Sequence, residues 1–234
     1  IEDNGSVGQL KQLLKIEGVP GPHRKEQPFA KPHFNPFDPS GRFVVVPDKG
    51  LDKTLVFRFE NGKLTPAGFP EALGRESSGP RHLAFHPTHP WAYIANELDS
   101  TVTACRFDAA TGQLTPFQIV SGLADSYTSN SRNSEIEVHA SGKSLYVSNR
   151  GEDTIGVFSI DSDTGRIRLI QSMHCGGKTP RFFALMPEGH FMQVLNEDSD
   201  SIVTMAVDSQ SGMLSDTGQR QTCGSPVCMV FSKS

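Results

Sequence analysis

The hydrophobic and polar positions of this chain repeat four times in the same order. Each copy begins with a turn, continues with an alternating apolar strand and a polar corner, and ends with a second apolar strand. The copies are "DPSGRFVVVPDKGLDKTLVFRF" (38–59), "HPTHPWAYIANELDSTVTACRF" (86–107), "HASGKSLYVSNRGEDTIGVFSI" (139–160) and "MPEGHFMQVLNEDSDSIVTMAV" (186–207). Because alternation with a period of two is typical of strands with one buried face, the chain is expected to consist of repeated small sheets.

Two markers keep the copies in phase. A polar residue follows the first strand of each copy, at Asp48, Asn96, Asn149 and Asn196. A glycine marks the trailing turn, at Gly8, Gly62, Gly112, Gly165 and Gly212. A repeat of roughly 40–50 residues with about four strands is typical of a β-propeller blade, because each small sheet can bury its faces only against its neighbours. The predicted fold class is therefore all-β, a β-propeller.

The ends of the chain hold incomplete copies of the repeat. Residues 1–18 resemble the outer part of a blade, and residues 224–231 resemble the opening strand of another. Residues 8–17 fit a helix and a strand equally well. We expect a single propeller domain over 1–234, incomplete at its N-terminus, that forms a C-terminal portion of about five blades of a larger propeller. A compact five-bladed closure is the alternative.

Composition narrows the classes of partner. The formal net charge is −4 with interspersed signs, so neither nucleic acid nor an anionic membrane is expected as a partner. No apolar run approaches the roughly 20 residues that span a bilayer, and no signal-peptide pattern opens the sequence. Four scattered cysteines match no zinc pattern and suit reduced thiols in a cytoplasmic protein. The sequence leaves the oligomeric state open.

Charged residues that differ between equivalent positions of the copies are the best candidates for a functional site, because an architectural requirement would recur in every copy. They are His33, Arg81, His82 and Arg181 before the apolar strand, and Lys49, Glu97, Arg150 and Glu197 after it. Arg can bind phosphate or carboxylate through two parallel hydrogen bonds, and Glu and His can transfer protons near neutral pH. The pattern favours a site for an anionic, oxygen-rich small molecule. The alternative is a network of ion pairs that ties the blades together.

Familiar catalytic and cofactor motifs are absent from the sequence. It contains no G-x-S-x-G, no G-x-x-x-x-G-K and no G-x-G-x-x-G. His86 and His89 of "HPTHP" are expected to be turn residues rather than metal ligands. Trp91 and Tyr93 alternate along a strand and are expected to pack between blades. We therefore expect neither a metal site nor a cofactor.

Several long phrases of the chain resemble the lactonase family of seven-bladed propellers. They are "GPRHLAFHP" with "YIANELDSTV", "EIEVHASGKSLYVSNRGEDTI", "GGKTPRFFALMPEGHFMQVLNEDSDSI" and "GSPVCMVF". The family includes bacterial 6-phosphogluconolactonases of the propeller type and fungal 3-carboxy-cis,cis-muconate lactonising enzymes. The resemblance implies a seven-bladed propeller whose pattern begins before Ile1.

The resemblance also implies the residues of a site. The family's P-H, P-R-H, N-E-L and S-N-R motifs fall on His33, Arg81, Glu97 and Arg150. Two positions depart from the family's pattern. Glu137 stands where the family often has His, and Glu197 stands where it often has Gln. Both departures change the charge expected at the mouth of the channel.

The reaction implied is hydrolysis of a sugar-acid lactone. We expect Glu97 to accept a proton from the attacking water, Arg81 and His33 to stabilise the oxyanion, and Arg150 to bind a phosphate or carboxylate. Further substrate-binding residues are His82 and Arg181. The expected partner is a small anionic lactone or sugar phosphate. The alternatives are a muconate-type cycloisomerase and a propeller that binds a partner without catalysis.

Overall fold

The computed structural model describes residues 4–231, and its strands form four antiparallel sheets in chain order. The first sheet contains β1 (Phe43–Asp48), β2 (Lys53–Glu60) and β3 (Lys63–Leu73). The second contains β4 (Pro80–Phe85), β5 (Trp91–Asn96), β6 (Thr101–Asp108) and β7 (Gln113–Ser121). The third contains β8 (Arg132–Val138), β9 (Ser144–Arg150), β10 (Thr154–Ile160) and β11 (Ile167–His174). The fourth contains β12 (Pro180–Leu185), β13 (Phe191–Asn196), the 3₁₀ turn η1 (Glu197–Ser199), β14 (Ser201–Val207) and β15 (Leu214–Thr222).

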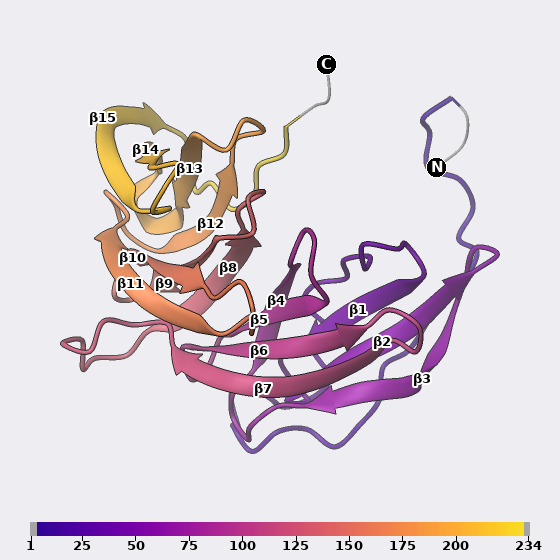
Figure 1. Ribbon diagram of the computed structural model, residues 1–234. Coiled ribbons are helices and arrows are strands. Elements are labelled where there is room, and N and C mark those ends of the chain that lie inside the picture. Colours follow the sequence, from indigo (N-terminus) through magenta and orange to yellow (C-terminus); the bar gives the residue numbers. More distant parts are fainter. Residues whose placement is uncertain (1–3, 232–234) are drawn as a thin grey trace.

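The all-β prediction is confirmed, since η1 is the one helical segment within residues 4–231. No helix in this range is long and apolar enough to cross a membrane. The sheets lie side by side in an open arc from β1–β3 to β12–β15 (Figure 1). Strand β8 contacts both β4 and β12 at the centre of the arc, so in the second, third and fourth sheets the segment that precedes the repeat is the innermost strand.

The hydrophobic cores lie between successive sheets, as a propeller requires. Trp91 and Tyr93 of β5 pack against Leu145 and Phe158 of the third sheet, which confirms their predicted place between blades. The Tyr93 hydroxyl donates a hydrogen bond of 3.0 Å to the carbonyl of Gly165. A buried Tyr that satisfies its hydroxyl in this way contributes apolar area without leaving a polar group unpaired.

The repeat glycines are fixed by contacts between sheets as well as by turn geometry. Gly165 has φ +72°, and a Cβ there would overlap the indole ring of Trp91 in the preceding sheet. Gly112 approaches Phe43 and Gly212 approaches Ser144 at the equivalent positions. Only glycine combines positive φ with so close an approach. The regular spacing of these glycines therefore follows from the packing of each sheet against the next.

The first sheet has three regular strands because the segment in its fourth position contains Pro32 and Pro36, which carry no backbone N–H. This segment meets β1 only through two isolated bridges, Pro32 with Asp48 and Phe37 with Val44. The N–H of His33 still donates to the carbonyl of Pro47 at 3.0 Å. The innermost position of the first sheet therefore holds His33 without a continuous ladder.

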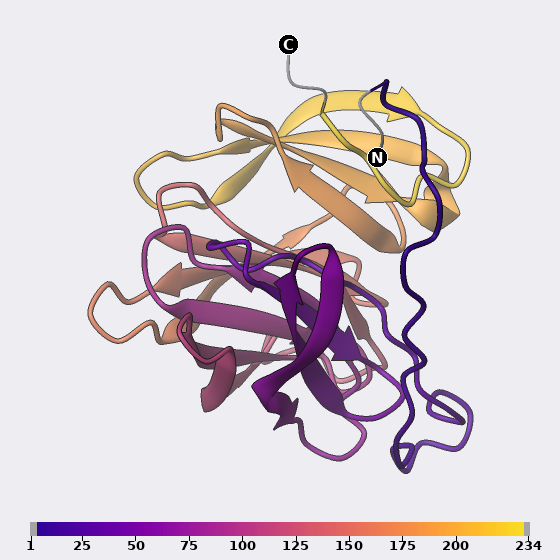
Figure 2. The ribbon, with the colours of Figure 1, turned by 90° about the vertical axis from the view of Figure 1, so that its right-hand side faces the viewer.

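The two ends of the described chain contain no regular strand. Residues 6–21 run along one side of the molecule as neither the helix nor the strand that the sequence allowed (Figure 2). The Gln12 side chain exchanges hydrogen bonds of 2.9 and 2.8 Å with the backbone of Leu64. The equivalent pairs between sheets are Gln118 with Ile167 and Gln171 with Leu214. The segment thus takes the place of an outer strand, and residues 224–231 are likewise extended without pairing.

The prediction of about five blades is therefore too high for the described residues, which form four sheets. The physical reason is that each end segment provides one extended stretch and no second strand with which to form a ladder.

The polar residues expected just after the first strand of each copy lie within that strand. Asp48, Asn96 and Asn196 are the last residues of their strands, and Asn149 precedes the last residue of β9.

Candidate functional site

Bulges in the innermost strands direct charged side chains to one end of the arc. In β4, Pro80 pairs with Asn96 and His82 pairs with Ala95, so Arg81 is the extra residue. The same shift occurs in β12 at Arg181. A bulge breaks the strict alternation of side chains between the two faces, and Arg81 and His82 are both buried as a result.

Glu97 is the centre of the charged cluster. It follows β5 directly, and its N–H donates to the carbonyl of Gly79 at 2.8 Å. Its carboxylate lies 3.0 Å from Nε of Arg81, 3.2 Å from Nη2 of Arg150 and 3.0 Å from Nζ of Lys49. These cations come from three different sheets, and the Glu97 side chain is only 4% exposed. The structure therefore brings Arg81, Glu97 and Arg150 together.

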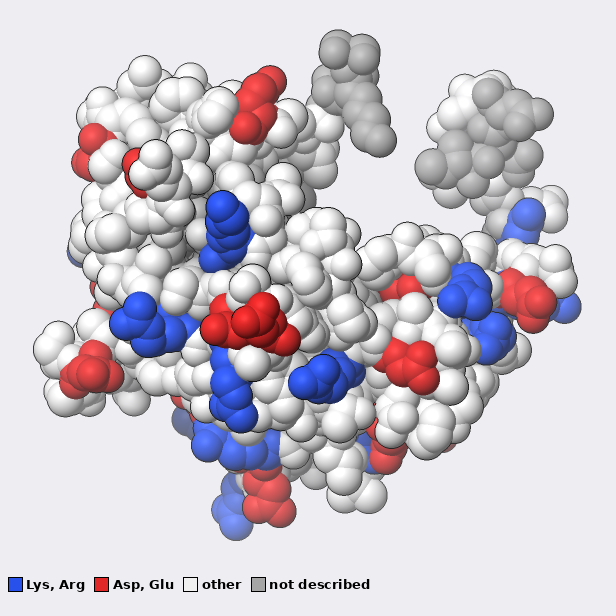
Figure 3. All heavy atoms as spheres, viewed as in Figure 1, with Lys and Arg blue, Asp and Glu red and all other residues white. Residues whose placement is uncertain are grey.

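A second carboxylate, Glu26, lies at the more exposed edge of this cluster. Its Oε1 is 3.0 Å from Nη1 of Arg132, and its Oε2 is 3.3 Å from Nζ of Lys49. Nη1 of Arg132 also lies 3.7 Å from Oε1 of Glu97. Figure 3 shows cationic and anionic side chains interspersed over one face of the molecule. Sequence reasoning missed Glu26 because it lies in a stretch that does not repeat.

Glu97 and Arg81 are both charged at neutral pH. Burial would raise the pKa of Glu97, but Arg150, Lys49 and Arg81 outweigh burial and lower it to about 2. Burial, followed by the charge of Arg150, lowers the pKa of Arg81 to about 10. A carboxylate with so low a pKa holds cations firmly and is a weak proton acceptor near pH 7.

His33 completes the predicted quartet as a neutral side chain. Its ring centroid lies 5.1 Å from that of His82. Burial, followed by the charge of Arg81, lowers the pKa of His33 to about 3. Its buried Nδ1 has no hydrogen-bond partner among residues 4–231. A neutral imidazole has one donor and one acceptor nitrogen.

Arg181 lies at the edge of the same cluster. Its Nη1 is 3.3 Å from Oε2 of Glu197, and its side chain is 35% exposed. Oγ of Ser134 donates to the carbonyl of Arg181 at 2.6 Å, and the carbonyl of Ser134 accepts from Nη1 of Arg81, so Ser134 links the two arginines. Burial lowers the pKa of Arg150, Glu97 opposes this, and the charge of Arg181 adds to the lowering. The six residues expected to catalyse the reaction or bind the substrate thus gather at one end of the arc: His33, Arg81, His82, Glu97, Arg150 and Arg181.

The cluster adjoins the central channel. A cavity of about 650 Å³ lies between β4, β8 and β12, and its lining is apolar except for Glu135 and Glu137. Oε1 of Glu135 lies 2.9 Å from Nδ1 of His82. Sequence reasoning noted Glu137 and missed Glu135, because the register shift in β8 between Asn133 and Ile136 is invisible in the alternation of residue types.

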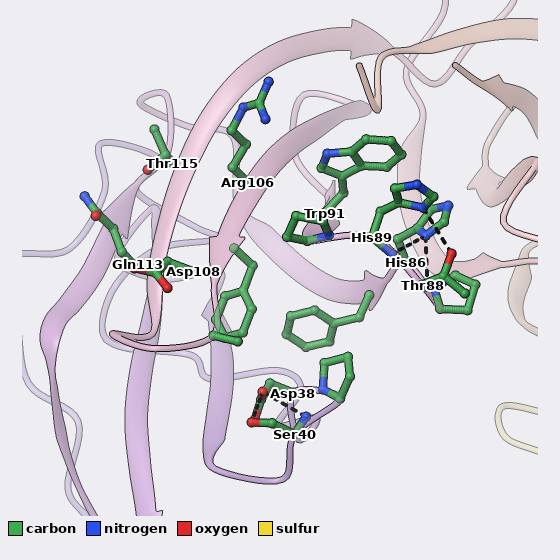
Figure 4. A pocket seen from close by; sticks show the side chains of 16 residues that line it. Asp38, Ser40, His86, Thr88, His89, Trp91, Arg106, Asp108, Gln113 and Thr115 are labelled. Carbon is green, nitrogen blue, oxygen red and sulfur yellow. Dashed lines mark hydrogen bonds between the residues drawn. The ribbon is translucent and has the colours of Figure 1, made fainter. Parts of the chain in front are cut away.

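A second cavity, of about 660 Å³, lies where β4 and β6 end, away from the charged cluster at the start of β4 (Figure 4). Nε2 of His86 lies 2.9 Å from the carbonyl of Gly142, and His89 stacks on Trp91 with ring centroids 4.5 Å apart. Both imidazoles thus have structural partners, as expected of turn residues. Within residues 4–231 no three His, Cys, Asp or Glu side chains converge as metal ligands.

Comparison with known proteins agrees with this architecture. The family model described as "Lactonase, 7-bladed beta-propeller" matches residues 1–231. The chain is 34% identical over 232 residues to 6-phosphogluconolactonase of Bacillus subtilis, a match that covers 99% of this chain and 65% of that protein. It is 26% identical over 229 residues to an uncharacterised Staphylococcus aureus protein, with coverages of 97% and 65%.

Solved structures show the same relationship. A protein from Lactobacillus plantarum superposes with a TM-score of 0.91 at 31% identity, over 97% of this chain and 65% of that chain. The periplasmic gluconolactonase of Pseudomonas aeruginosa superposes with a TM-score of 0.89 at 28% identity, over 97% and 63%. The chain thus spans somewhat less than two thirds of the length of these relatives. It belongs to the lactonase family of seven-bladed β-propellers.

Proposed function

We propose that this chain hydrolyses the lactone of a sugar acid, with 6-phosphogluconolactone as the leading candidate substrate. The observation that carries the proposal is the buried set of Arg81, Arg150 and Lys49 around Glu97, next to the neutral imidazole of His33. The name of the Bacillus subtilis relative supports the same substrate class.

Hydrolysis requires stabilisation of the negative charge that forms on the carbonyl oxygen when water attacks. Arg81 is fixed for this purpose, because its Nη1 donates to the carbonyl of Ser134 at 2.8 Å. Its Nε lies 3.0 Å from the Glu97 carboxylate, which holds the guanidinium group from a second side. The His33 imidazole, whose ring centroid lies 5.1 Å from that of His82 next to Arg81 in the chain, is proposed to share this stabilisation of the oxyanion.

Glu97 acts in this scheme by holding the cations. Its pKa of about 2 makes it a poor acceptor for a proton from water, so the catalytic role expected from the family resemblance does not suit it. A buried carboxylate between Arg81 and Arg150 fixes the positions of both guanidinium groups and compensates their charge.

The phosphate or carboxylate of the substrate would bind at the more exposed side of the cluster. Arg150 lies at the boundary, and the Arg132 and Arg181 side chains are 46% and 35% exposed. Guanidinium groups match the geometry of phosphate and carboxylate oxygens. A small anionic lactone or sugar phosphate is the partner that this arrangement fits. A cytoplasmic location stays a prediction, and one relative is named as periplasmic.

The test is lactone hydrolysis measured as acid release above the spontaneous rate. We expect saturable hydrolysis of 6-phosphogluconolactone, and we expect Arg81→Met to lower kcat/KM by about 100-fold. Arg166→Gln, at an exposed turn, is the matched control and should retain the activity. Absence of saturable hydrolysis in the unaltered chain would refute the proposal. Consumption of a carboxylated muconate under the same conditions would assign the cycloisomerase reaction instead.

A further inference from the structure

His82 and Glu135 form a buried pair that the scheme above does not use. They belong to neighbouring innermost strands, β4 and β8, and their relative exposures are 8% and 6%. Nδ1 of His82 lies 2.9 Å from Oε1 of Glu135. A buried carboxylate next to one imidazole nitrogen is the arrangement that fixes the tautomer and orientation of a proton-transferring histidine.

The pair is held rigidly from several sides. The N–H of Glu135 donates to Oγ of Ser148 at 2.9 Å, and the N–H of Ile136 donates to Oε1 of Glu135 at 3.0 Å. The ring of Phe34 stacks on His82 with a centroid separation of 4.5 Å and an interplanar angle of 17°. The imidazole is therefore fixed both at its edge and on its face.

This geometry determines which nitrogen is available. Glu135 as a carboxylate accepts a hydrogen bond, so Nδ1 of His82 carries the proton and Nε2 carries the lone pair of the neutral ring. The charged and titratable groups around His82 are His33 beside its ring, Glu135 at Nδ1, and Arg81 next to it in the chain.

We propose that His82 is the proton acceptor of the hydrolytic reaction and that Glu135 is its positioning residue. The proposal rests on the proposed lactone hydrolysis. Nε2 of His82 takes a proton from water while the water oxygen bonds to the carbonyl carbon. The ring C–O bond then breaks, the electron pair stays on the ring oxygen, and that oxygen takes the proton from His82. The products are the open hydroxy acid and the neutral imidazole, so atoms and charges balance.

The alternatives within the cluster are less suited to this step. Glu97 forms ion pairs with three cationic side chains at 3.0–3.2 Å, and its pKa is about 2. His33 has no carboxylate partner among the described residues, and the positive charge of Arg81 opposes its protonation. His82 combines a fixed tautomer, a counter-charge for the imidazolium and a position beside His33 and Arg81.

The test compares His82→Gln, Glu135→Gln and Glu137→Gln in the lactone assay. Removing a proton acceptor costs about 10²–10⁴-fold in rate, so we expect His82→Gln to lower kcat by at least about 100-fold with KM changed less than threefold. Glu135→Gln should also lower kcat, because the neutral amide can keep the hydrogen bond to Nδ1 but removes the negative charge that stabilises the imidazolium of His82. Glu137→Gln, two residues along the same strand, is the control and should keep kcat within twofold.

A rescue experiment separates chemistry from structure. In His82→Ala, added imidazole should restore part of kcat, whereas a purely structural role of His82 predicts no such rescue. Retention of kcat in His82→Gln, or loss of activity in His82→Ala without rescue, would overturn the assignment. If the unaltered chain hydrolyses no lactone, the proposed function itself fails, and the two failures are thereby distinguished.

Discussion

The carboxyl of Glu137 allows a quantitative prediction about stability. It faces the apolar channel, and its one hydrogen bond with residues 4–231 comes from the N–H of Leu185 at 3.0 Å. Burial raises its pKa from an ordinary 4.5 to about 7; the Leu185 hydrogen bond opposes this rise, and the charge of Glu135 adds to it. The folded protein therefore binds a proton at Glu137 over a pH range in which the unfolded chain has released it.

The sign of the effect follows from linkage. A carboxyl whose pKa is higher in the folded state contributes its full stabilisation below the unfolded value, and that contribution is lost as pH rises through the folded value. At about 1.4 kcal/mol for each pH unit between 4.5 and 7, the loss is at most about 3.5 kcal/mol. Glu137→Gln cannot titrate, so its advantage over the unaltered chain should grow by that amount between pH 4.5 and pH 8.

The assay is urea unfolding followed by the fluorescence of Trp91, which is the one tryptophan of the chain and is buried. The free energies of unfolding of Glu137→Gln and of the unaltered chain are compared at intervals from pH 4.5 to pH 8. The exposed Glu188→Gln is the control and should leave the profile unchanged. Parallel profiles for Glu137→Gln and the unaltered chain, within about 0.5 kcal/mol, would refute the reasoning.

Three further predictions concern the cluster and the blades. Glu97→Gln leaves buried cations without compensation and should lower the free energy of unfolding by about 3 kcal/mol; a loss under 0.5 kcal/mol in urea unfolding would contradict this. Arg132→Gln should raise KM for 6-phosphogluconolactone by about tenfold and leave KM for gluconolactone unchanged, whereas an equal change for both lactones would exclude a phosphate contact. Gly165→Ala adds a Cβ that overlaps Trp91 and should lower stability by at least about 2 kcal/mol more than Gly218→Ala, which has similar φ and open space around it. Equal losses in these two variants would remove the contact from the explanation.

The architecture is predictable from the sequence because its signals are repeated. Apolar alternation marks the strands of every sheet, and the glycines at positions such as Gly165 mark where one sheet docks on the next. Because the same pattern occurs in four copies, an ambiguous strand in one copy can be assigned by comparison with the other three. The end segments lack this advantage, and the prediction of their strands failed for that reason.

The site is predictable only in part. Arg81, Glu97 and Arg150 can be singled out because the other copies of the repeat have different residues at the equivalent positions. The structure places both arginines in contact with Glu97. Glu26 has no repeated counterpart, and the partnership of Glu135 with His82 depends on bulges that residue patterns do not show. Protonation also depends on summed burial and charge, so the ionised state of Glu97 emerged only from its three-dimensional surroundings.

The most direct measurement is the rate of acid release from 6-phosphogluconolactone by the unaltered chain, as a function of lactone concentration. The account predicts hydrolysis above the spontaneous rate that saturates, that is inhibited competitively by 6-phosphogluconate, and that falls by about 100-fold in Arg81→Met. The account is contradicted if the rate equals the spontaneous rate at every lactone concentration while the fluorescence of the buried Trp91 shows that the protein is folded.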